Sequence, residues 1–94
     1  MVEPEVTVVI PVFNDRQSIG IAIPGSLELL SRITQGFELI IAEDGSTDGS
    51  ADLVRHYEQR DSRIRLLHSD ERLGRGRARN RAIFEAKGTI VCYY

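Results

Sequence analysis

Short apolar runs alternate along the chain with longer segments in which apolar residues recur every three or four positions. The runs span Val6 to Val12, Phe37 to Ala42, Ile64 to His68 and Thr89 to Tyr94. The first, second and fourth runs are nearly continuous, a pattern typical of strands that are covered on both faces of a sheet. Cys92, the only cysteine, lies in the fourth run, so we expect it to be buried as a small apolar side chain.

The segments between the runs have the periodicity of amphipathic helices. We predict helices over Ser18 to Ile33, Gly49 to Gln59 and Arg75 to Lys87. Pro24 and Gly25 lie inside the first segment and predict a kink or a break near Ile23.

The ends and inward faces of these helices follow from the same spacing. Ser46 or Asp48 is the expected N-cap of the second helix, and Gly88 is the expected stop of the third. The positions expected to face the core are Ile19, Ile23, Leu27, Leu30 and Ile33, then Leu53, Val54 and Tyr57, then Ala78, Ala82, Ile83 and Ala86.

The predicted order of elements is β-α-β-α-β-α-β within 94 residues, which suffices for one small domain. Strands that alternate with helices imply an α/β fold with a doubly wound, mostly parallel, Rossmann-like sheet. Ligands of such open sheets bind beyond the carboxyl ends of the strands. The segments of interest are therefore Pro11 to Asp15, Glu43 to Asp48 and Ser69 to Arg77.

Composition and charge narrow the functional classes. A net charge of −2, with 41% hydrophobic and 28% charged residues, indicates a globular chain without general affinity for nucleic acids or membrane surfaces. The single cysteine excludes an internal disulfide and a cysteine-rich zinc cluster. Neither a signal peptide nor an apolar run of the roughly 20 residues that a membrane helix needs is apparent. We expect a cytoplasmic location, or the cytoplasmic face of the membrane for a longer protein.

The first strand end, Pro11-Val12-Phe13-Asn14-Asp15, offers one aromatic face. Phe13 either stacks on a nucleobase or packs in the core behind an ordinary turn, and this segment taken alone favours the core.

The second strand end runs from Glu43 to Gly49 and places two carboxylates side by side, which is expected to reduce stability through their repulsion. A carboxylate here accepts a hydrogen bond from a ring N–H of uracil or guanine, and the glycines allow a ligand close to the backbone. The segment also matches the first half of an EF-hand calcium loop. That loop needs a glutamate at its twelfth position, where this chain has Arg55, so a calcium loop is rejected.

The third strand end, Arg72-Leu73-Gly74-Arg75-Gly76-Arg77, combines glycines with arginines ahead of a helix, which suits a diphosphate. The alternatives are a solvated basic helix face and an arginine-rich nucleic-acid surface, and the latter lacks interleaved aromatic residues and a positive net charge. Arg75 and Arg77 lie nearest the helix start and are the best anion ligands. The dinucleotide-binding G-x-G-x-x-G pattern is missing after the first strand, and a P-loop is missing altogether.

The order and spacing of these three segments resemble the family 2 glycosyltransferases. The resemblance rests on Val8 to Asp15, Ile40 to Gly49 and Gly74 to Asn80, and it covers essentially the whole chain. It implies the A-type glycosyltransferase fold, in which a doubly wound sheet binds a nucleoside-diphosphate sugar. Family members usually carry Tyr at Phe13, Glu at Asp15 and Asp at Glu43, and these departures are conservative.

The resemblance also implies roles for residues of this chain. Pro11 and Phe13 would flank the nucleobase, Asp44 would accept from its N–H, and Ala42 and Asp15 would line the nucleoside pocket. Arg75 or Arg77 would contact the base or the diphosphate.

The resemblance further implies an inverting transfer of sugar from a UDP- or GDP-sugar to a polyprenyl phosphate, a glycolipid or a polysaccharide. Mg²⁺ or Mn²⁺, held by an Asp-x-Asp motif after the fourth strand, would neutralise the leaving diphosphate. Residues 1–94 lack that motif and the catalytic base, so we expect a nucleotide-sugar-binding half domain that does not itself turn over.

Two further expectations concern partners and class. The family topology places the fourth strand beside the first, so the Ile90 to Tyr94 edge is expected to pair with another copy, in a homodimer or by aggregation. The alternative function is a stand-alone nucleotide-binding or regulatory module without catalysis.

Overall fold

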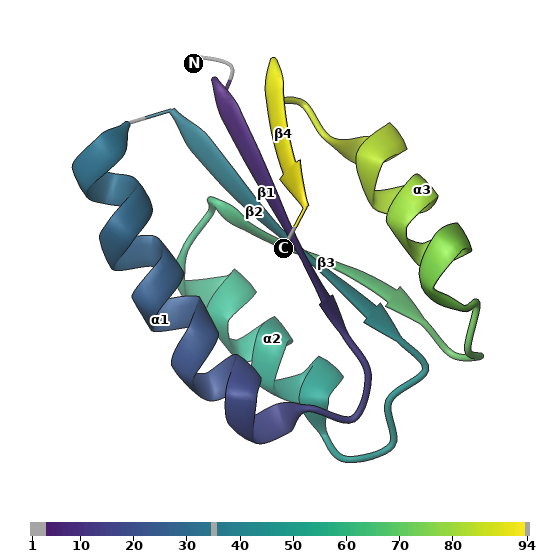
Figure 1. Cartoon of the computed structure of the whole chain (residues 1–94). Helices are drawn as coiled ribbons and strands as arrows, with labels where there is room; N and C mark the ends of the chain where they lie inside the picture. The colour runs from purple at the N-terminus through teal and green to yellow at the C-terminus, as the bar shows by residue number, and fades with distance from the viewer. Residues whose placement is uncertain (1–3, 35, 94) are drawn as a thin grey trace.

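The computed structural model describes residues 4–34 and 36–93, and its elements follow the predicted order (Figure 1). The strands are β1 (Val6–Val12), β2 (Phe37–Asp44), β3 (Ile64–Ser69) and β4 (Ile90–Tyr93), and the helices are α1 (Arg16–Ile33), α2 (Ser50–Arg60) and α3 (Arg75–Glu85). The four strands are parallel and form one sheet in the order β3-β2-β1-β4. The predicted doubly wound α/β fold is confirmed.

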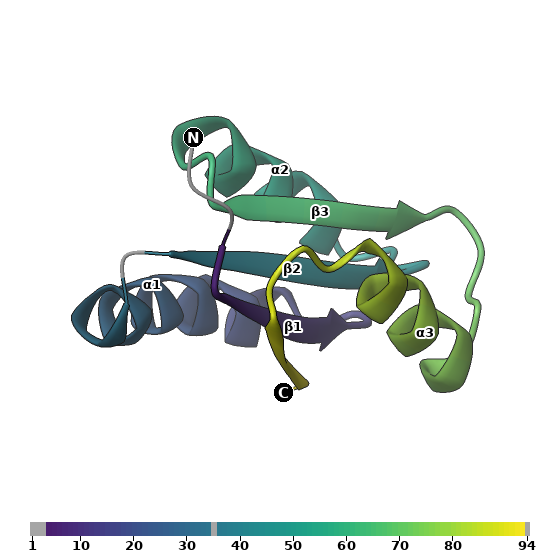
Figure 2. The ribbon, with the colours of Figure 1, turned by 90° about the horizontal axis from the view of Figure 1, so that it is seen from above.

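Helices cover both faces of the sheet (Figure 2), with α1 and α2 on one face and α3 on the other. The core beneath α1 and α2 consists of Ile10, Val12, Ile19, Ile23, Leu39, Ile41, Val54 and Ile64. The core beneath α3 is smaller and consists of Val9, Ile40, Ala42 and Ala82. β2 lies between these cores, and all eight of its residues are buried, as its continuous apolar run predicts.

The first helix is longer than predicted and contains no break. α1 begins at Arg16 and continues through Pro24 to Ile33, so a break near Ile23 is wrong, while the alternative of a kink there stays a prediction. Proline removes one hydrogen bond, but Ile23 and Leu30 are buried on either side of it, and this packing holds the helix together. Ile33 was expected to face the core and is instead 69% exposed, because it ends the helix where the described residues cover little of it.

The second helix begins one residue later than predicted. Its N-cap is Gly49, not Ser46 or Asp48, and the φ of 87° at Gly49 is a left-handed conformation that glycine adopts readily. The Asp48 carboxylate accepts from the main-chain N–H of Ser50 at 3.0 Å and from that of Arg16 at 3.1 Å. Asp48 therefore accepts from the main-chain N–H of the first residue of both α1 and α2.

The third helix ends earlier than predicted, at Glu85 instead of Lys87, with Ala86 rather than Gly88 at its C-cap. Ala82 is buried as predicted, whereas Ile83 is 44% exposed. One residue along a helix turns the side chain by about 100°, so Ile83 leaves the inward face that Ala82 occupies.

The fourth strand lies beside β1, but it is not buried. Ile90, Val91 and Cys92 are all exposed, so the predicted burial of Cys92 is wrong. β4 forms one edge of the sheet in the described part of the chain, and α3 packs on β1 and β2 instead. Tyr94, the last residue of the predicted strand, lies outside the described residues.

A buried polar network fixes the turn that leads into β4. The carboxylate of Glu38, 5% exposed, accepts from the Thr7 hydroxyl at 2.7 Å, from Arg65 at 3.0 Å and from the main-chain N–H of Lys87 at 2.5 Å. The Gly88 N–H donates in turn to the Thr7 hydroxyl at 2.8 Å. Burial raises the pKa of Glu38, but these hydrogen bonds outweigh it, so the pKa lies below its ordinary value.

Candidate functional site

A cavity of about 420 Å³ opens at the carboxyl ends of β1 and β2, beside the start of α3. Its walls are Pro11, Val12, Phe13, Asp15, Ala42, Asp44, Arg72, Arg75 and Ala78. Six of the seven residues predicted for the site therefore surround one cavity, although they come from three separate strand ends. The seventh, Arg77, is not among the lining residues.

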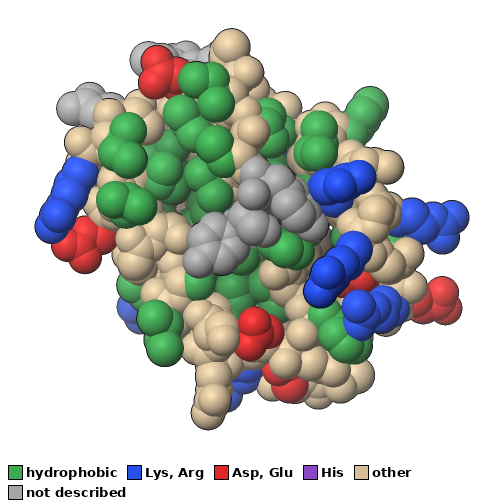
Figure 3. Space-filling view, in the orientation of Figure 1, with side chains coloured by type: hydrophobic (Ala, Val, Ile, Leu, Met, Phe, Trp, Pro, Cys, Tyr) green, Lys and Arg blue, Asp and Glu red, His purple; other side chains and the backbone are tan. Residues whose placement is uncertain are grey.

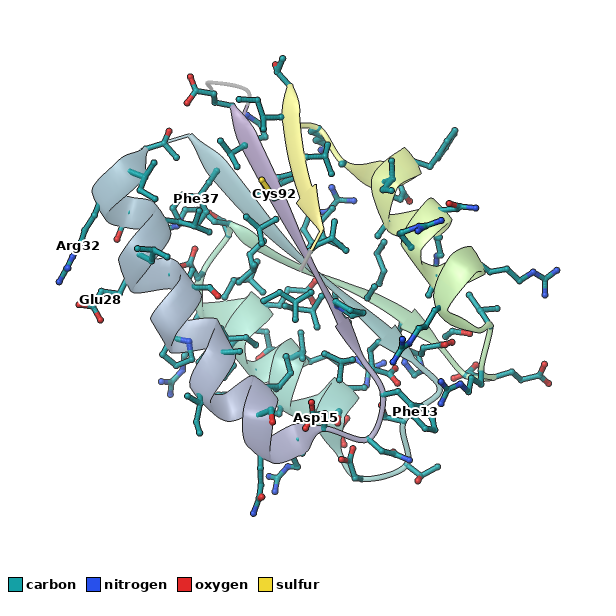
Figure 4. The ribbon with its side chains drawn as sticks, in the orientation of Figure 1. Phe13, Asp15, Glu28, Arg32, Phe37 and Cys92 are labelled. Carbon is teal, nitrogen blue, oxygen red and sulfur yellow. The ribbon has the colours of Figure 1, made fainter. Side chains whose placement is uncertain are left out.

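Phe13 and Asp15 lie where β1 passes into α1, at the opposite end of the sheet from Phe37 (Figure 4). Phe13 is 41% exposed, so the alternative in which it packs in the core is wrong. Pro11 is the penultimate residue of β1 and is also exposed. The β1 end of the cavity thus offers an accessible aromatic ring.

Side-chain to main-chain hydrogen bonds lock the first two loops together. The amide oxygen of Asn14 accepts from the main-chain N–H of Thr47 at 2.7 Å, and the hydroxyl of Ser46 accepts from the main-chain N–H of Asn14 at 2.9 Å. Asn14 has a φ of 48°, a conformation that asparagine tolerates better than most residues. This reciprocal pair fixes the position of Phe13 relative to the end of β2.

Asp44 anchors the third loop. One oxygen of its carboxylate accepts from the main-chain N–H of Leu73 at 2.5 Å, and the other accepts from that of Gly74 at 3.0 Å. Gly45 lies close to the backbone of this loop, since a Cβ at Gly45 would be 2.8 Å from the main-chain nitrogen of Arg72. Asp44 therefore lines the cavity while it holds the backbone that carries the arginines, a second role that its position after a strand does not reveal.

The adjacent carboxylates Glu43 and Asp44 do not share partners. Neighbouring residues of a strand point to opposite faces, so Glu43 turns away from Asp44 towards β3. Its side chain is fully buried and pairs with His68, and it also accepts from the main-chain N–H of Ser46. The expected repulsion is offset because each carboxylate has its own donors.

His68 lies between two acids. Its Nδ1 contacts Glu43, and its Nε2 is 2.8 Å from the carboxylate of Asp70. The hydrogen bonds to Glu43 and then to Asp70 raise the pKa of His68 above its ordinary value of 6.5, although partial burial opposes them. His68 was not among the predicted site residues, and its position at the end of the third apolar run was the only sign of it in the sequence.

Arginines form the outer wall of the cavity. Arg75 begins α3, and a helix amino end favours an anion. Arg72 stacks over Phe13 with its guanidinium carbon 3.7 Å from the ring centroid. Arg72 was not among the predicted site residues, although it belongs to the same basic segment. Basic side chains gather over α3 on the face drawn in Figure 3.

Small side chains form the floor of the cavity. Ala42 of β2 is 4% exposed, and Ala78 of α3 is 7% exposed. Neither side chain is large enough to fill the space between the sheet and the start of α3, so the cavity reaches down to the end of β2. The arrangement combines an aromatic ring, two carboxylates and two cations above a small apolar floor, which suits a planar ring joined to an anion.

The described residues contain no group of three His, Cys, Asp or Glu side chains that could hold a metal ion. No helix among them is long and apolar enough to cross a membrane. An Asp-x-Asp sequence is also absent from residues 1–94.

The fold and the cavity define a doubly wound α/β domain of the nucleotide-binding class. The sequence model of Glycosyl transferase family 2 matches residues 7–94, and the chain belongs to this family.

Known proteins agree with this assignment. The chain is 38% identical to Glycosyltransferase AglD of Haloferax volcanii over 96% of this chain and 15% of that protein. It is 30% identical to the undecaprenyl-phosphate 4-deoxy-4-formamido-L-arabinose transferase of Photorhabdus laumondii subsp. laumondii, over 93% of this chain and 27% of that protein.

A solved structure has the same fold. The mannosyltransferase PcManGT of Pyrobaculum calidifontis, in complex with GDP-Man and Mn²⁺, superposes with a TM-score of 0.78 and 27% identity. The match covers 96% of this chain and 26% of the mannosyltransferase, so the chain spans about a quarter of that protein. The A-type glycosyltransferase fold implied by the sequence resemblance is confirmed.

Proposed function

We propose that the cavity binds the nucleotide part of a UDP- or GDP-sugar, and that the whole protein transfers the sugar with inversion. The observation that carries this proposal is the convergence of Phe13, Asp44 and Arg75 on one cavity from three different strand ends. An aromatic face, a carboxylate and a cation are the groups that a base, its ring N–H and a diphosphate each need.

The roles that the resemblance implies fall on six of the residues that line the cavity. Pro11 and Phe13 flank the base, and Asp44 accepts from its ring N–H with a lone pair not used by Leu73 and Gly74. Ala42 and Asp15 line the nucleoside, and Arg75 contacts the diphosphate. Arg77 was the alternative to Arg75, and we assign the role to Arg75 because only it lines the cavity.

The chemistry of transfer belongs to the proposal for the whole protein. Mg²⁺ or Mn²⁺ would neutralise charge on the leaving diphosphate, and the Mn²⁺ in the mannosyltransferase complex supports this expectation. The described residues supply no metal site, so we assign none of them to the ion and expect no sugar transfer by residues 1–94 alone.

The acceptor and the location of the whole protein are also proposals. The relative from Photorhabdus is an undecaprenyl-phosphate transferase by its name, which supports a polyprenyl phosphate as one of the proposed acceptors, beside a glycolipid or a polysaccharide. A lipid-linked acceptor would place the whole protein at the cytoplasmic face of the membrane.

Titration of ¹⁵N-labelled protein with UDP, GDP, ADP and NAD tests the nucleotide site. We expect amide shifts at Phe13, Asp44 and Arg75 with UDP or GDP and much smaller ones with the other two. Shifts confined to the exposed arginines of α3, equal for all four ligands, would contradict a base pocket.

We also propose that two copies pair through β4. The exposed Ile90 and Val91 lie on a strand whose outer edge has no neighbour in the described part of the chain. Light scattering should then report a dimer that a lysine at Val91 weakens, since charge blunts an edge strand. A monomer at high concentration would contradict this pairing.

A further inference from the structure

Arg72 occupies the face of Phe13 that the cavity presents to a ligand. Both side chains line the cavity, and the guanidinium carbon lies 3.7 Å from the ring centroid. The same side chain places its Nε 4.0 Å from the carboxylate of Asp44. Arg72 thus contacts at once the aromatic ring and the acid that we assign to the base.

A base and Arg72 cannot share this face of the ring. A separation of 3.7 Å is ordinary van der Waals contact between two planar groups, so nothing fits between them. A base sandwiched between Phe13 and Arg72 would need about twice that spacing. Stacking of a base on Phe13 therefore requires the guanidinium to leave.

The backbone of Arg72 is held by hydrogen-bonded neighbours, whereas its side chain is held only by the stacking contact with Phe13 and the 4.0 Å pair with Asp44. The next two main-chain N–H groups, at Leu73 and Gly74, donate to Asp44, and the backbone of Arg72 lies against Gly45. The side chain itself is 48% exposed and donates no hydrogen bond within the described residues. Displacement of the guanidinium is therefore a rotation of the side chain, which leaves the loop in place.

We propose that Arg72 imitates a base in the ligand-free site, with the guanidinium stacked on Phe13 beside Asp44, and that a diphosphate draws it away. This inference rests on the proposed nucleotide function. A nucleoside only replaces the stacking contact that Arg72 gives up, whereas a nucleoside diphosphate also provides oxygens that accept from the displaced guanidinium. Arg72 consequently makes the site select nucleoside diphosphates over nucleosides.

The first measurement concerns the ligand-free protein. The guanidinium carbon of Arg72 lies over the ring of Phe13, so the NMR signals of the neighbouring Nε–H and Cδ protons should move upfield and return to ordinary values in Phe13→Leu. Saturation with UDP or GDP, whichever binds, should likewise return them. Ordinary shifts in the ligand-free protein would overturn the inference without touching the proposed function.

The second measurement separates the stacking contact from the charge. Arg72→Gln should bind uridine or guanosine about three-fold more tightly, because it no longer competes for Phe13. The same variant should bind UDP or GDP roughly five-fold more weakly, because it loses a charged donor. Arg77→Gln removes an equal charge outside the cavity and should leave the nucleoside affinity unchanged.

The outcomes distinguish the two proposals. If UDP or GDP binds while the Arg72 signals stay in place, or if Arg72→Gln shifts both affinities in one direction, the inference fails and the nucleotide site stands. If neither the parent chain nor Arg72→Gln binds any nucleotide, the proposed function fails, and the base-imitating role of Arg72 fails with it.

Discussion

The two ends of β2 each carry a buried acid, and the two acids serve different purposes. Glu38 lies near the start of the strand and is 5% exposed, while Asp44 lies at its end and is 6% exposed. Both accept main-chain N–H groups from the segments that flank α3, Lys87 in one case and Leu73 and Gly74 in the other. By burial and by main-chain hydrogen bonds alone, the two acids could not be told apart.

The neighbours of Glu38 and Asp44 distinguish the two acids. Glu38 is enclosed by Thr7 and Arg65, and it lines no described cavity. Asp44 faces a cavity, and its cationic neighbour Arg72 is half exposed and holds it only loosely, at 4.0 Å. A buried acid is therefore a candidate binding residue when one of its partners can be exchanged for a ligand. We expect changes at the Glu38 end to affect stability and changes at the Asp44 end to affect binding.

Gly88→Ala should give the largest loss of stability. A Cβ at Gly88 would lie 2.5 Å from the Thr7 hydroxyl and 2.6 Å from the Thr7 main-chain nitrogen, so the turn into β4 must move. We expect the free energy of unfolding to fall by about 3 kcal/mol, measured by urea denaturation. Gly76→Ala is the matched control, since its Cβ meets nothing within 4 Å and its helical position favours alanine by about 1 kcal/mol.

Glu38→Gln should lower the free energy of unfolding by about 2 kcal/mol, because the amide cannot accept from all three donors. The pKa of Glu38 lies below its ordinary value of 4.5, so its contribution is present above that pH and is lost as the pH falls through the folded value. The difference between variant and parent should therefore shrink in acid.

Glu28→Gln serves as the control for Glu38→Gln. Glu28 forms an exposed ion pair with Arg32, and its loss should change stability by less than about 0.5 kcal/mol. The nucleotide affinity of folded Glu38→Gln should equal that of the parent chain. A selective loss of affinity would place Glu38 in the binding machinery and end the distinction drawn between the two acids.

Asp44→Asn should affect stability less and binding more. Asparagine keeps one oxygen for Leu73 or Gly74 and turns its NH₂ group towards the other N–H, so we expect a loss of about 1 kcal/mol. The affinity for UDP or GDP should fall at least about tenfold, because the acceptor for the base is gone. Urea denaturation and the amide titration measure both effects on one sample. Unchanged affinity would remove Asp44 from the proposed site.

Much of the fold follows from the sequence because it depends on periodicity. The alternation of apolar runs with helical segments predicts the four strands and three helices, and β2 is as buried as its continuous run implies. The exposure of an edge strand does not follow from its apolar pattern. Ile90 to Cys92 are as apolar as a central strand, and only the position of β4 beside β1 reveals that they are exposed. The continuity of α1 through Pro24 likewise depends on packing from outside the helix.

The site was predictable in outline because parallel strands bring their carboxyl ends to one edge. This rule gathers Phe13, Asp44 and Arg75 without knowledge of any side-chain direction. It does not distinguish Arg75 from Arg77, which depends on the rotation of α3, or reveal that Arg72 stacks on Phe13. The stacking of Arg72 depends on side-chain geometry in loops that Asp44 and Gly45 hold together. No local sequence pattern encodes this geometry.

The smallest expected effect concerns His68, whose partner Glu43 is a third buried acid of β2. Glu43 neighbours Asp44 but faces the other side of the sheet, and it also holds the main-chain N–H of Ser46. The pKa of His68 is raised, first by Glu43 and then by Asp70. The protonated histidine therefore stabilises the fold fully below pH 6.5, its ordinary value, and this contribution is lost as the pH rises through the folded pKa.

Urea denaturation at several pH values should thus show stability that declines above pH 6.5, and His68→Gln should remove the decline. Asp70→Asn should reduce it only in part, because Asp70 is 96% exposed and is the second of the two partners. The ring-proton titration of His68 reports its pKa directly. If that titration is centred at or below 6.5, or if His68→Gln keeps the parent slope, the pairing of His68 with Glu43 adds no pH-dependent stability, and the interpretation of this pair is wrong.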